Sequence, residues 1–458
     1  MEWGGPILTI LDVVMREAAL FAAAGFLVLG LGDLVVDALW LALLPRRAKA
    51  RHLTARDIAL SEAPGMLAVF VPAWNEAGVV GPMLRGALGA WGEGDYRIYV
   101  GCYPNDPATI AEVREVNSPR VRLIVGDAPG PTTKADCLNR LWLALLADEA
   151  AEGRQAKAVV LHDAEDVVHS AELALFDSFA GEYDLVQLPV MPLIHPESRW
   201  VGGHYADEFA ESHGKEMLVR QWLGAALPSA GVGCAFSRDI LARIAERGCG
   251  LPFDADSLTE DYELGLKVRE EGGTSLFLRI PAAAGRPLVT TREYFPGTVP
   301  AAVAQKARWM TGIALSGWDR MGWRGGVAER WMRLRDRQSL LAALLLFAGY
   351  LACALWLILL PARAITGIEP TPLPPLLSAL VGVNMVLLAW RMLVRAAFTA
   401  RAYGWKEGLR SVPRALVANA VAMLAAAAAL SRYRALRRTG RARWDKTDHI
   451  FPEAVPAE

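Results

Sequence analysis

The chain has 458 residues, and its 48 Lys and Arg against 49 Asp and Glu give a formal net charge of −1. Apolar residues make up 53% and charged residues 21%, which excludes an intrinsically disordered chain and a coiled coil. The charge is unevenly divided, because residues 331–444 hold 16 basic and three acidic residues, for +13, and the rest carries −14. Long apolar runs interrupt the basic region, so we expect no nucleic-acid partner.

The cysteines are odd in number, and no two of them form a Cys-x-x-Cys pair. They are Cys102, Cys137, Cys234, Cys249 and Cys353. This spacing excludes a disulfide scaffold and a thiolate zinc site, and it is typical of a reducing compartment.

The first apolar run is Ala18–Leu44, which has 27 residues and contains no Lys or Arg. A spanning helix needs roughly 20 apolar residues, so residues 1–44 are predicted to form an amphipathic segment followed by a transmembrane anchor. Asp33 and Asp37 lie four residues apart, on one face of that helix. Charges at that depth usually face protein, so we expect them to pair with basic residues of neighbouring helices. A role along the path of a polymer is the alternative.

Residues 63–330 alternate short β-rich runs with helical stretches, which predicts an α/β fold with a mostly parallel sheet and helices on both faces. The predicted strands are Met66–Pro72, Arg97–Cys102, Val121–Val125, Ala158–His162, Leu185–Val190 and Gly233–Phe236. The predicted helices are Gly78–Trp91, Thr133–Glu149, Ser170–Phe179, His204–Leu223 and Asp239–Glu246. Ligands of such sheets bind beyond the carboxyl ends of the strands, so the residues that follow each strand are candidates for a site.

The strongest candidate for a metal site follows the strand predicted at 158–162. Asp163, Glu165 and Asp166 place three acids within four residues, and their repulsion is costly unless a cation joins them or water solvates them. Oxygen ligands favour Mg²⁺ or Mn²⁺, and a zinc site with the flanking histidines is disfavoured because no further ligand spacing supports it. A solvated acidic loop is the alternative.

The motif Thr259-Glu260-Asp261 is predicted to begin a helix. Thr259 is expected to cap the helix with its hydroxyl, and the two acids favour the positive N-terminal end. Capping alone is a sufficient explanation of this motif when it is considered by itself.

Gln305, Arg308 and Trp309 share one face of a predicted helix because they are three or four residues apart. The face offers an amide, a fixed guanidinium fork and an aromatic plate, which suit a phosphate or a sugar. A solvated amphipathic surface is the alternative.

Residues 331–443 are predicted to complete a membrane region. Leu340–Leu360 and Leu373–Trp390 contain 21 and 18 uncharged residues, so both are predicted to span the bilayer. Ala415–Leu430 has only 16 residues and has Arg on both sides. This combination favours interfacial or re-entrant helices at about 393–430 over a further span.

The basic residues also predict the orientation, because Lys and Arg concentrate on the cytoplasmic side of a membrane. Clusters of them follow the first span at 46–51 and precede the second at 330–337, whereas the 361–372 loop holds one Arg and one Glu. We therefore expect residues 45–338 in the cytoplasm and the 361–372 loop on the opposite side.

The order of these motifs resembles the membrane-embedded family 2 glycosyltransferases with a GT-A fold, over about residues 65–450. The matching motifs are, in order, Pro72-Ala73-Trp74-Asn75-Glu76, Asp106, Lys134-Ala135-Asp136-Cys137-Leu138-Asn139, Asp163-Ala164-Glu165, Thr259-Glu260-Asp261 and Gln305-Lys306-Ala307-Arg308-Trp309. The last two together resemble the processive branch that includes cellulose and hyaluronan synthases. The residues around Asp106 and Asp163, and Trp444-Asp445-Lys446-Thr447 in a predicted tail at 444–458, are most similar to the bacteriophage adsorption protein B group.

The resemblance implies a role for each matching residue. The residues implied to bind the donor are Pro72, Glu76, Asp106, Lys134 and Asp163. Those implied to hold Mg²⁺ or Mn²⁺ are Asp163 and Glu165, the latter standing where many relatives have Asp. The implied catalytic residues are Asp261, as the base, and Glu260. Those implied to clamp the diphosphate and the acceptor are Gln305, Arg308, Trp309 and Cys234.

The implied function is an inverting, metal-dependent glycosyl transfer at the bacterial inner membrane. The donor would be a nucleotide sugar such as a UDP-N-acetylhexosamine, and the acceptor a growing surface or secreted polysaccharide. The lipid bilayer and a periplasmic or outer-membrane export protein would be further partners. The alternatives are a non-processive transferase acting on a lipid carrier and a catalytically degenerate membrane receptor or scaffold. Members of the adsorption-protein group often continue into a cyclic-di-GMP-binding domain, for which we expect no counterpart up to Glu458.

Overall fold

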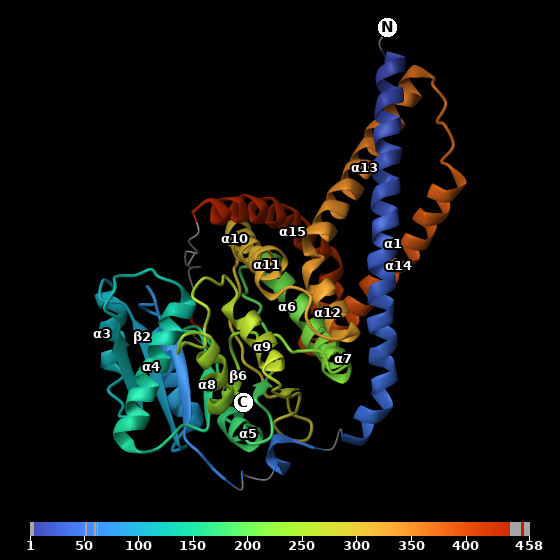
Figure 1. Cartoon of the computed structure of the whole chain (residues 1–458). Coiled ribbons are helices and arrows are strands. Elements are labelled where there is room, and N and C mark those ends of the chain that lie inside the picture. The colour runs from blue at the N-terminus through green and yellow to red at the C-terminus, as the bar shows by residue number, and fades with distance from the viewer. Residues whose placement is uncertain (1–3, 51–52, 59–60, 62, 440–449, 453–458) are drawn as a thin grey trace.

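The computed structural model describes residues 4–50, 53–58, 61, 63–439 and 450–452 (Figure 1). The predicted Trp444-Asp445-Lys446-Thr447 motif and Arg51 of the basic flank lie outside these residues. Within them, a twisted sheet with helices on both sides occupies one end of the molecule, and a group of long helices extends away from it.

The sheet has seven strands in the order β3-β2-β1-β4-β6-β5-β7. The strands are β1 (Leu67–Pro72), β2 (Tyr96–Cys102), β3 (Val121–Val125), β4 (Ala158–Leu161), β5 (Leu185–Gln187), β6 (Cys234–Ser237) and β7 (Ser275–Phe277). All neighbours pair in parallel except β6, which is antiparallel to β4 and β5. The six predicted strands and the mostly parallel sheet are confirmed. The seventh was not predicted, because three residues are too short for a visible alternation.

The helices around the sheet cover both of its faces, as predicted. They are α2 (Val80–Trp91), α3 (Pro107–Glu115), α4 (Lys134–Glu152), α5 (Glu172–Phe179), α8 (Arg238–Arg247) and α9 (Glu260–Glu270). Alternate residues of β1 supply the two cores: Val69 packs in the core that contains α2 and α5, and Phe70 in the core that contains α4 and α8. Helix α3 was not predicted, since its sequence begins as a Pro- and Asn-rich turn.

Two helices contain a π-helical turn where the sequence predicts none. The helix predicted at 204–223 is α6 (Val201–Glu211) and α7 (Met217–Trp222), joined through the π-helical residues Ser212–Glu216. Likewise α10 (Val299–Met310) continues through Thr311–Ser316 into α11 (Gly317–Met321). Such turns add one residue within a helix and are frequent at functional sites. Helix α12 (Val327–Arg337) follows.

In the part of the chain that the structure describes, four helices are long and apolar enough to cross a membrane: α1 (Gly4–Ala50), α13 (Ser339–Thr366), α14 (Pro375–Tyr403) and α15 (Trp405–Thr439). Residues 393–403, which we expected in an interfacial segment, instead continue α14. The chain turns only at Gly404, whose φ of +89° favours glycine.

The long helices are arranged in two directions. Helices α1, α13 and α14 lie side by side, and the loop between α13 and α14 lies beside the N-terminus, far from the sheet (Figure 1). Arg16 in α1 donates to the backbone oxygen of Pro372 at 2.8 Å, and Arg363 lies 2.7 Å from Asp12, which joins the two ends. Helix α15 instead lies across α10 and α6.

Buried ion pairs connect the long helices to the sheet domain through α6 and the π-helical turn after it. Lys215, which is 1% exposed, bonds to Asp37 of α1 and lies 2.6 Å from Glu211. Asp33 lies 3.0 Å from Arg335 and 3.4 Å from Arg391. The predicted pairing of both acids with neighbouring basic residues is therefore confirmed.

A second set of ion pairs joins α6 to α14 and α15. Asp207, which is fully buried, lies 3.1 Å from Arg395 of α14 and 2.7 Å from Arg414 of α15. Burial of such charges is tolerated only when each has a partner and further hydrogen bonds. Here Thr399 adds a hydrogen bond to Asp207, so three helices meet at one carboxylate.

The Lys215→Met substitution tests this junction. It leaves Asp37 and Glu211 buried without the shared ammonium, and we expect a loss of about 3–5 kcal/mol in stability, the usual cost of breaking a buried pair. The apparent unfolding temperature of the detergent-purified chain measures it. The exposed pair of Arg154 and Asp95 supplies the control, because Arg154→Met removes a surface pair of about 0–1 kcal/mol. Equal shifts for the two variants would contradict a stabilising role of the buried network.

Candidate active site

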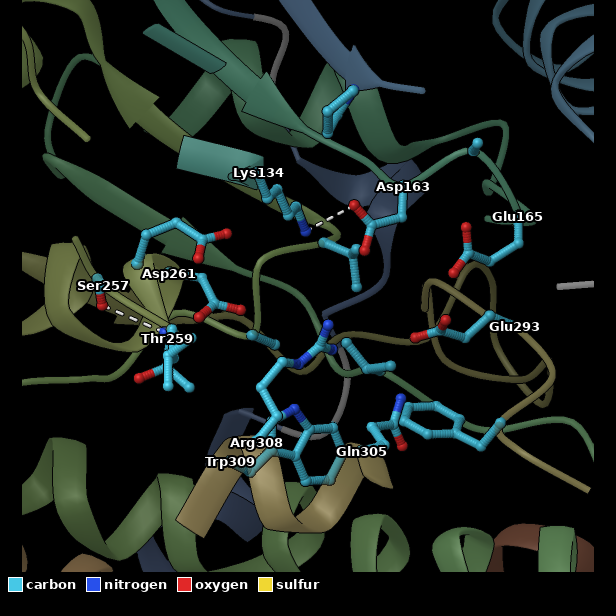
Figure 2. Close-up of a pocket in the computed structure, with 18 of the residues that line it drawn as sticks. Lys134, Asp163, Glu165, Ser257, Thr259, Asp261, Glu293, Gln305, Arg308 and Trp309 are labelled. Atoms are coloured by element: carbon cyan, nitrogen blue, oxygen red, sulfur yellow. Dashed lines mark hydrogen bonds and ion pairs between the residues drawn. The ribbon is translucent and has the colours of Figure 1, made fainter. Parts of the chain in front are cut away.

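One cavity brings together nearly all of the predicted site residues. It lies beyond the carboxyl ends of β1 and β4 and is closed by the start of α9 and one face of α10 (Figure 2). The predicted residues that line it are Pro72, Glu76, Lys134, Asp163, Glu165, Glu260, Asp261, Gln305, Arg308 and Trp309. Asp106 and Cys234 are not among the lining residues.

The loop after β1 is held from behind by α3. Asp106 caps α3 and also accepts a hydrogen bond from the backbone of Asn75 at 2.6 Å. Thr109 accepts from the backbone of Glu76 at 2.9 Å. Asp106 thus orders the loop that presents Glu76.

Lys134 enters the cavity from the first turn of α4. Thr133 caps this helix by accepting from the backbone of Asp136, which fixes the start of the helix. The ammonium of Lys134 lies 2.6 Å from a carboxylate oxygen of Asp163. Burial disfavours the charged ammonium, but Asp163, Glu260 and Asp261 outweigh it and raise the pKa of Lys134. The lysine therefore remains a cation in this cavity.

The acidic loop after β4 is buried and held in place by a histidine. His162, fully buried, lies with one ring nitrogen 2.7 Å from Asp166 and the other 2.5 Å from Glu172. Asp166 in turn accepts from the backbone of Asp163 at 3.1 Å. Glu165 and Asp166 are 4% and 1% exposed, so the alternative of a solvated loop is wrong. The third acid of the motif, Asp166, organises the loop behind the cavity, and Asp163 and Glu165 face it.

The start of α9 presents Glu260 and Asp261 to the cavity. Thr259 occupies the N-cap position but makes no capping hydrogen bond, so that prediction is wrong. Its backbone angles, φ −143° and ψ 61°, depart from the extended conformation of a normal cap, and its hydroxyl is buried beside Gly312 instead. Gly231 packs so closely on Asp261 that an added Cβ would lie 2.4 Å from a carboxylate oxygen. This glycine, with φ +78°, leaves room for the acid.

The predicted face of α10 is confirmed, since Gln305, Arg308 and Trp309 all line the cavity. The indole of Trp309 lies edge-on to Tyr205 at 6.1 Å and to Phe295 at 6.3 Å between ring centroids. Figure 2 shows Arg308 reaching between Asp261 on one side and Glu293 on the other.

Glu293 is a lining residue that the sequence analysis missed. Its carboxylate lies on the same side of the cavity as that of Glu165 (Figure 2). It lies in an extended segment that is held to residues 190–193 by isolated β-bridges. Because this segment forms no regular strand, the sequence showed no strand pattern that would have pointed to Glu293. Cys234, by contrast, is fully buried in β6, and burial raises the pKa of its thiol to about 12. That Cys234 contacts the acceptor stays a prediction, which rests on the resemblance to the glycosyltransferase family.

The cavity carries more negative than positive side chains, which favours the binding of a cation. Among the described residues six carboxylates line it against two cationic side chains, Lys134 and Arg308. Within the same residues no three His, Cys, Asp or Glu side chains lie close enough together to hold a metal ion by themselves. Mg²⁺ commonly uses only one or two protein carboxylates and completes its coordination with substrate phosphates. Asp163 and Glu165 therefore fit a hard divalent cation that a bound diphosphate would complete.

Residues 64–312, more than half of the chain, match the family model described as glycosyltransferase like family 2. Bacteriophage adsorption protein B of Escherichia coli (strain K12) is 34% identical over 490 aligned residues, which cover 99% of this chain and 65% of that protein. Bacteriophage N4 adsorption protein B of Escherichia coli O157:H7 matches to the same extent. The chain thus spans 65% of the length of these relatives.

A solved structure matches almost the whole chain. It is the mannosyltransferase PcManGT from Pyrobaculum calidifontis in complex with GDP-Man and Mn²⁺, with a TM-score of 0.52 and 16% sequence identity. The match covers 92% of this chain and 99% of that one. At this identity the likeness concerns the fold alone.

Glu260 predicts a pH dependence of stability. Burial, and then the charge of Asp261, raise the pKa of Glu260 from 4.5 to about 7. Because the folded state holds this proton more tightly than the unfolded state, protonation of Glu260 stabilises the fold. This stabilisation is fully present below about pH 4.5 and is lost as the pH rises through about 7. A shift of this size corresponds to about 3 kcal/mol.

Glu260→Gln removes this titration. We expect the variant to gain stability relative to the wild type between pH 5 and pH 8, measured as the difference in apparent unfolding temperature at each pH. Glu246→Gln, at an exposed position in α8, is the control. A difference for Glu260→Gln that does not change with pH would refute the assignment.

Proposed function

Because this chain belongs to glycosyltransferase-like family 2, we propose that it transfers a sugar from a nucleotide-sugar donor to a growing polysaccharide, with inversion at the anomeric carbon. The observation that carries the proposal is the convergence of the acids, Lys134, Arg308 and Trp309 on one cavity at the carboxyl edge of the sheet. The donor we propose is a UDP-N-acetylhexosamine. This choice rests on the similarity to the adsorption-protein group alone.

Asp261 is the proposed catalytic base. It accepts the proton of the acceptor hydroxyl as that oxygen forms a bond to the anomeric carbon. The bond from the anomeric carbon to the diphosphate oxygen breaks, and its electron pair leaves with the nucleoside diphosphate. The neighbouring Glu260, with a raised pKa, limits the negative charge next to the base.

Lys134 and Arg308 stabilise the departing diphosphate. Both line the same cavity, and fixed cations aimed at a leaving group stabilise the negative charge that develops on it. A divalent cation held by Asp163 and Glu165 would act as a Lewis acid that offsets the charge on the diphosphate. Pro72, Glu76 and the loop ordered by Asp106 form the proposed nucleotide end of the site.

Trp309 and Gln305 form the proposed acceptor end. The Trp309 ring is held by Tyr205 and Phe295, so it offers a rigid apolar surface of the kind that sugar rings pack against. Gln305 adds an amide that can bond a sugar hydroxyl.

The membrane arrangement is part of the proposal. Helices α1, α13 and α14 would span the inner membrane of a bacterium, with the sheet domain in the cytoplasm and the α13–α14 loop on the opposite side. Helix α15, which lies across α10, would rest at the cytoplasmic surface. A polymer made at this site would need a periplasmic or outer-membrane export protein as a partner.

Asp261→Asn tests the base. The amide keeps the shape and cannot accept the proton, so we expect transfer to fall by about 10²–10⁴-fold, with the affinity for the donor retained. Release of the nucleoside diphosphate and the length of radiolabelled product from purified protein measure the effect. Asp256→Asn, at an exposed position five residues earlier, is the matched control. Normal turnover by Asp261→Asn would disprove the role of this residue. If the wild-type protein adds only one sugar, the non-processive alternative would be favoured.

Removal of divalent cations tests the role of Asp163 and Glu165. We expect excess EDTA to abolish transfer and added Mg²⁺ or Mn²⁺ to restore it, with Glu165→Gln raising the metal concentration needed for half-maximal activity. The readout is the initial rate across a metal titration. Full activity in excess EDTA would exclude a metal at these carboxylates.

A further inference from the structure

A second and larger cavity, of about 1050 Å³, lies next to the active-site cavity, behind the extended segments at residues 190–191 and 292–293. We call it the membrane-side cleft. Its lining comes from the C-terminal part of α1, the end of α14 with the start of α15, and residues 278–292 of the sheet domain. The cleft therefore lies where the proposed membrane helices meet the sheet domain.

The membrane-side cleft is strongly cationic. The arginines that line it are Arg199, Arg279, Arg286, Arg292, Arg401 and Arg410. Glu407 is the one carboxylate among the described lining residues, and it is already bonded to Arg410 and Arg414. The arginines come from both sides of the cleft, so a ligand between them meets positive charge on each side. Arginine forks suit phosphate oxygens.

One wall of the membrane-side cleft is aromatic and apolar. Trp40 of α1 and Phe398 of α14 both line it and pack edge to face, with ring centroids 5.1 Å apart. Leu44 and Leu53 continue this wall. Trp40 therefore contributes its ring, and not its buried indole N–H, to this wall.

The wall between the two cavities is a single layer of extended backbone. Val190 and Glu293 line the active-site cavity, whereas Met191 and Arg292 line the membrane-side cleft. The two segments are joined by backbone hydrogen bonds, including one of 2.9 Å from Met191 to the oxygen of Thr291. The cleft is thus separate from the active site.

We propose that the membrane-side cleft binds a membrane lipid with an anionic phosphate headgroup. The arginines take the phosphodiester, and Trp40, Leu44 and Phe398 contact the start of the acyl chains. An amphiphile matches a cleft with one cationic and one apolar wall, and basic pockets at the ends of membrane helices suit such headgroups. The site rests on the proposed membrane orientation but not on the proposed transfer reaction.

The test uses the full chain purified in a neutral detergent and follows its apparent unfolding temperature. A ligand that binds only the folded state raises this temperature. We expect phosphatidylglycerol to raise it by several degrees, and phosphatidylcholine or inorganic phosphate at the same concentration to leave it almost unchanged. Native mass spectrometry should show a retained phosphatidylglycerol. Equal shifts with phosphatidylcholine, or the whole shift with inorganic phosphate, would overturn the proposal.

A pair of double variants separates a site from general attraction to anionic lipid. Arg286→Gln with Arg401→Gln removes two exposed arginines, one from each side of the cleft. Arg434→Gln with Arg438→Gln removes two exposed arginines of α15 outside the cleft. We expect the first pair to abolish most of the shift caused by phosphatidylglycerol and the second to keep it. Equal losses would overturn the site. Since the readout is stability, failure of the transfer assay leaves this test unaffected.

Discussion

The cost of burying a charge governs how the two parts of this protein are joined. The junction between the sheet domain and the long helices contains Asp37, Asp207 and Lys215, each 6% exposed or less at its side chain. Each is stable there only because it has an oppositely charged partner, and at least one partner of each comes from a different helix. The pairing demands one alignment of α1, α14 and α15 on α6, since a shift would leave a buried charge unpaired. The same helix then places Phe209 in the active-site cavity and Ala210 in the membrane-side cleft.

Residues outside the cavity position the ones inside it. Asp106 orders the loop of Glu76, and His162 with Asp166 orders the loop of Asp163. These supporting groups are buried, so each of their hydrogen bonds is made in a setting where an unmade bond is costly. A short acidic sequence can therefore serve two purposes, with one acid turned inward to hold the loop and two turned toward a ligand.

The two cavities are lined by neighbouring residues of the same two extended segments, at 190–191 and 292–293. In an extended segment successive side chains point to opposite faces, and for this reason Glu293 and Arg292 belong to different cavities. Acids dominate one cavity and arginines the other. The near-zero net charge of the chain thus conceals this local separation of acids from arginines.

Local patterns in the sequence were enough to predict six strands, the long apolar helices, the acidic loop after β4 and the α10 face, because hydrophobic period and motif spacing depend on neighbours along the chain. Pro72, Glu76 and Lys134 were expected at the site only through the resemblance to the glycosyltransferase family. Local patterns could not predict Glu293, the missing cap at Thr259 or the partners of Asp33 and Asp37. Those depend on which distant segments lie together, and a buried hydrogen bond or ion pair is decided by its partner, not by its own sequence. The sequence by itself determined the kinds of chemistry available, and only the tertiary structure decided which side chains face a ligand and which support them.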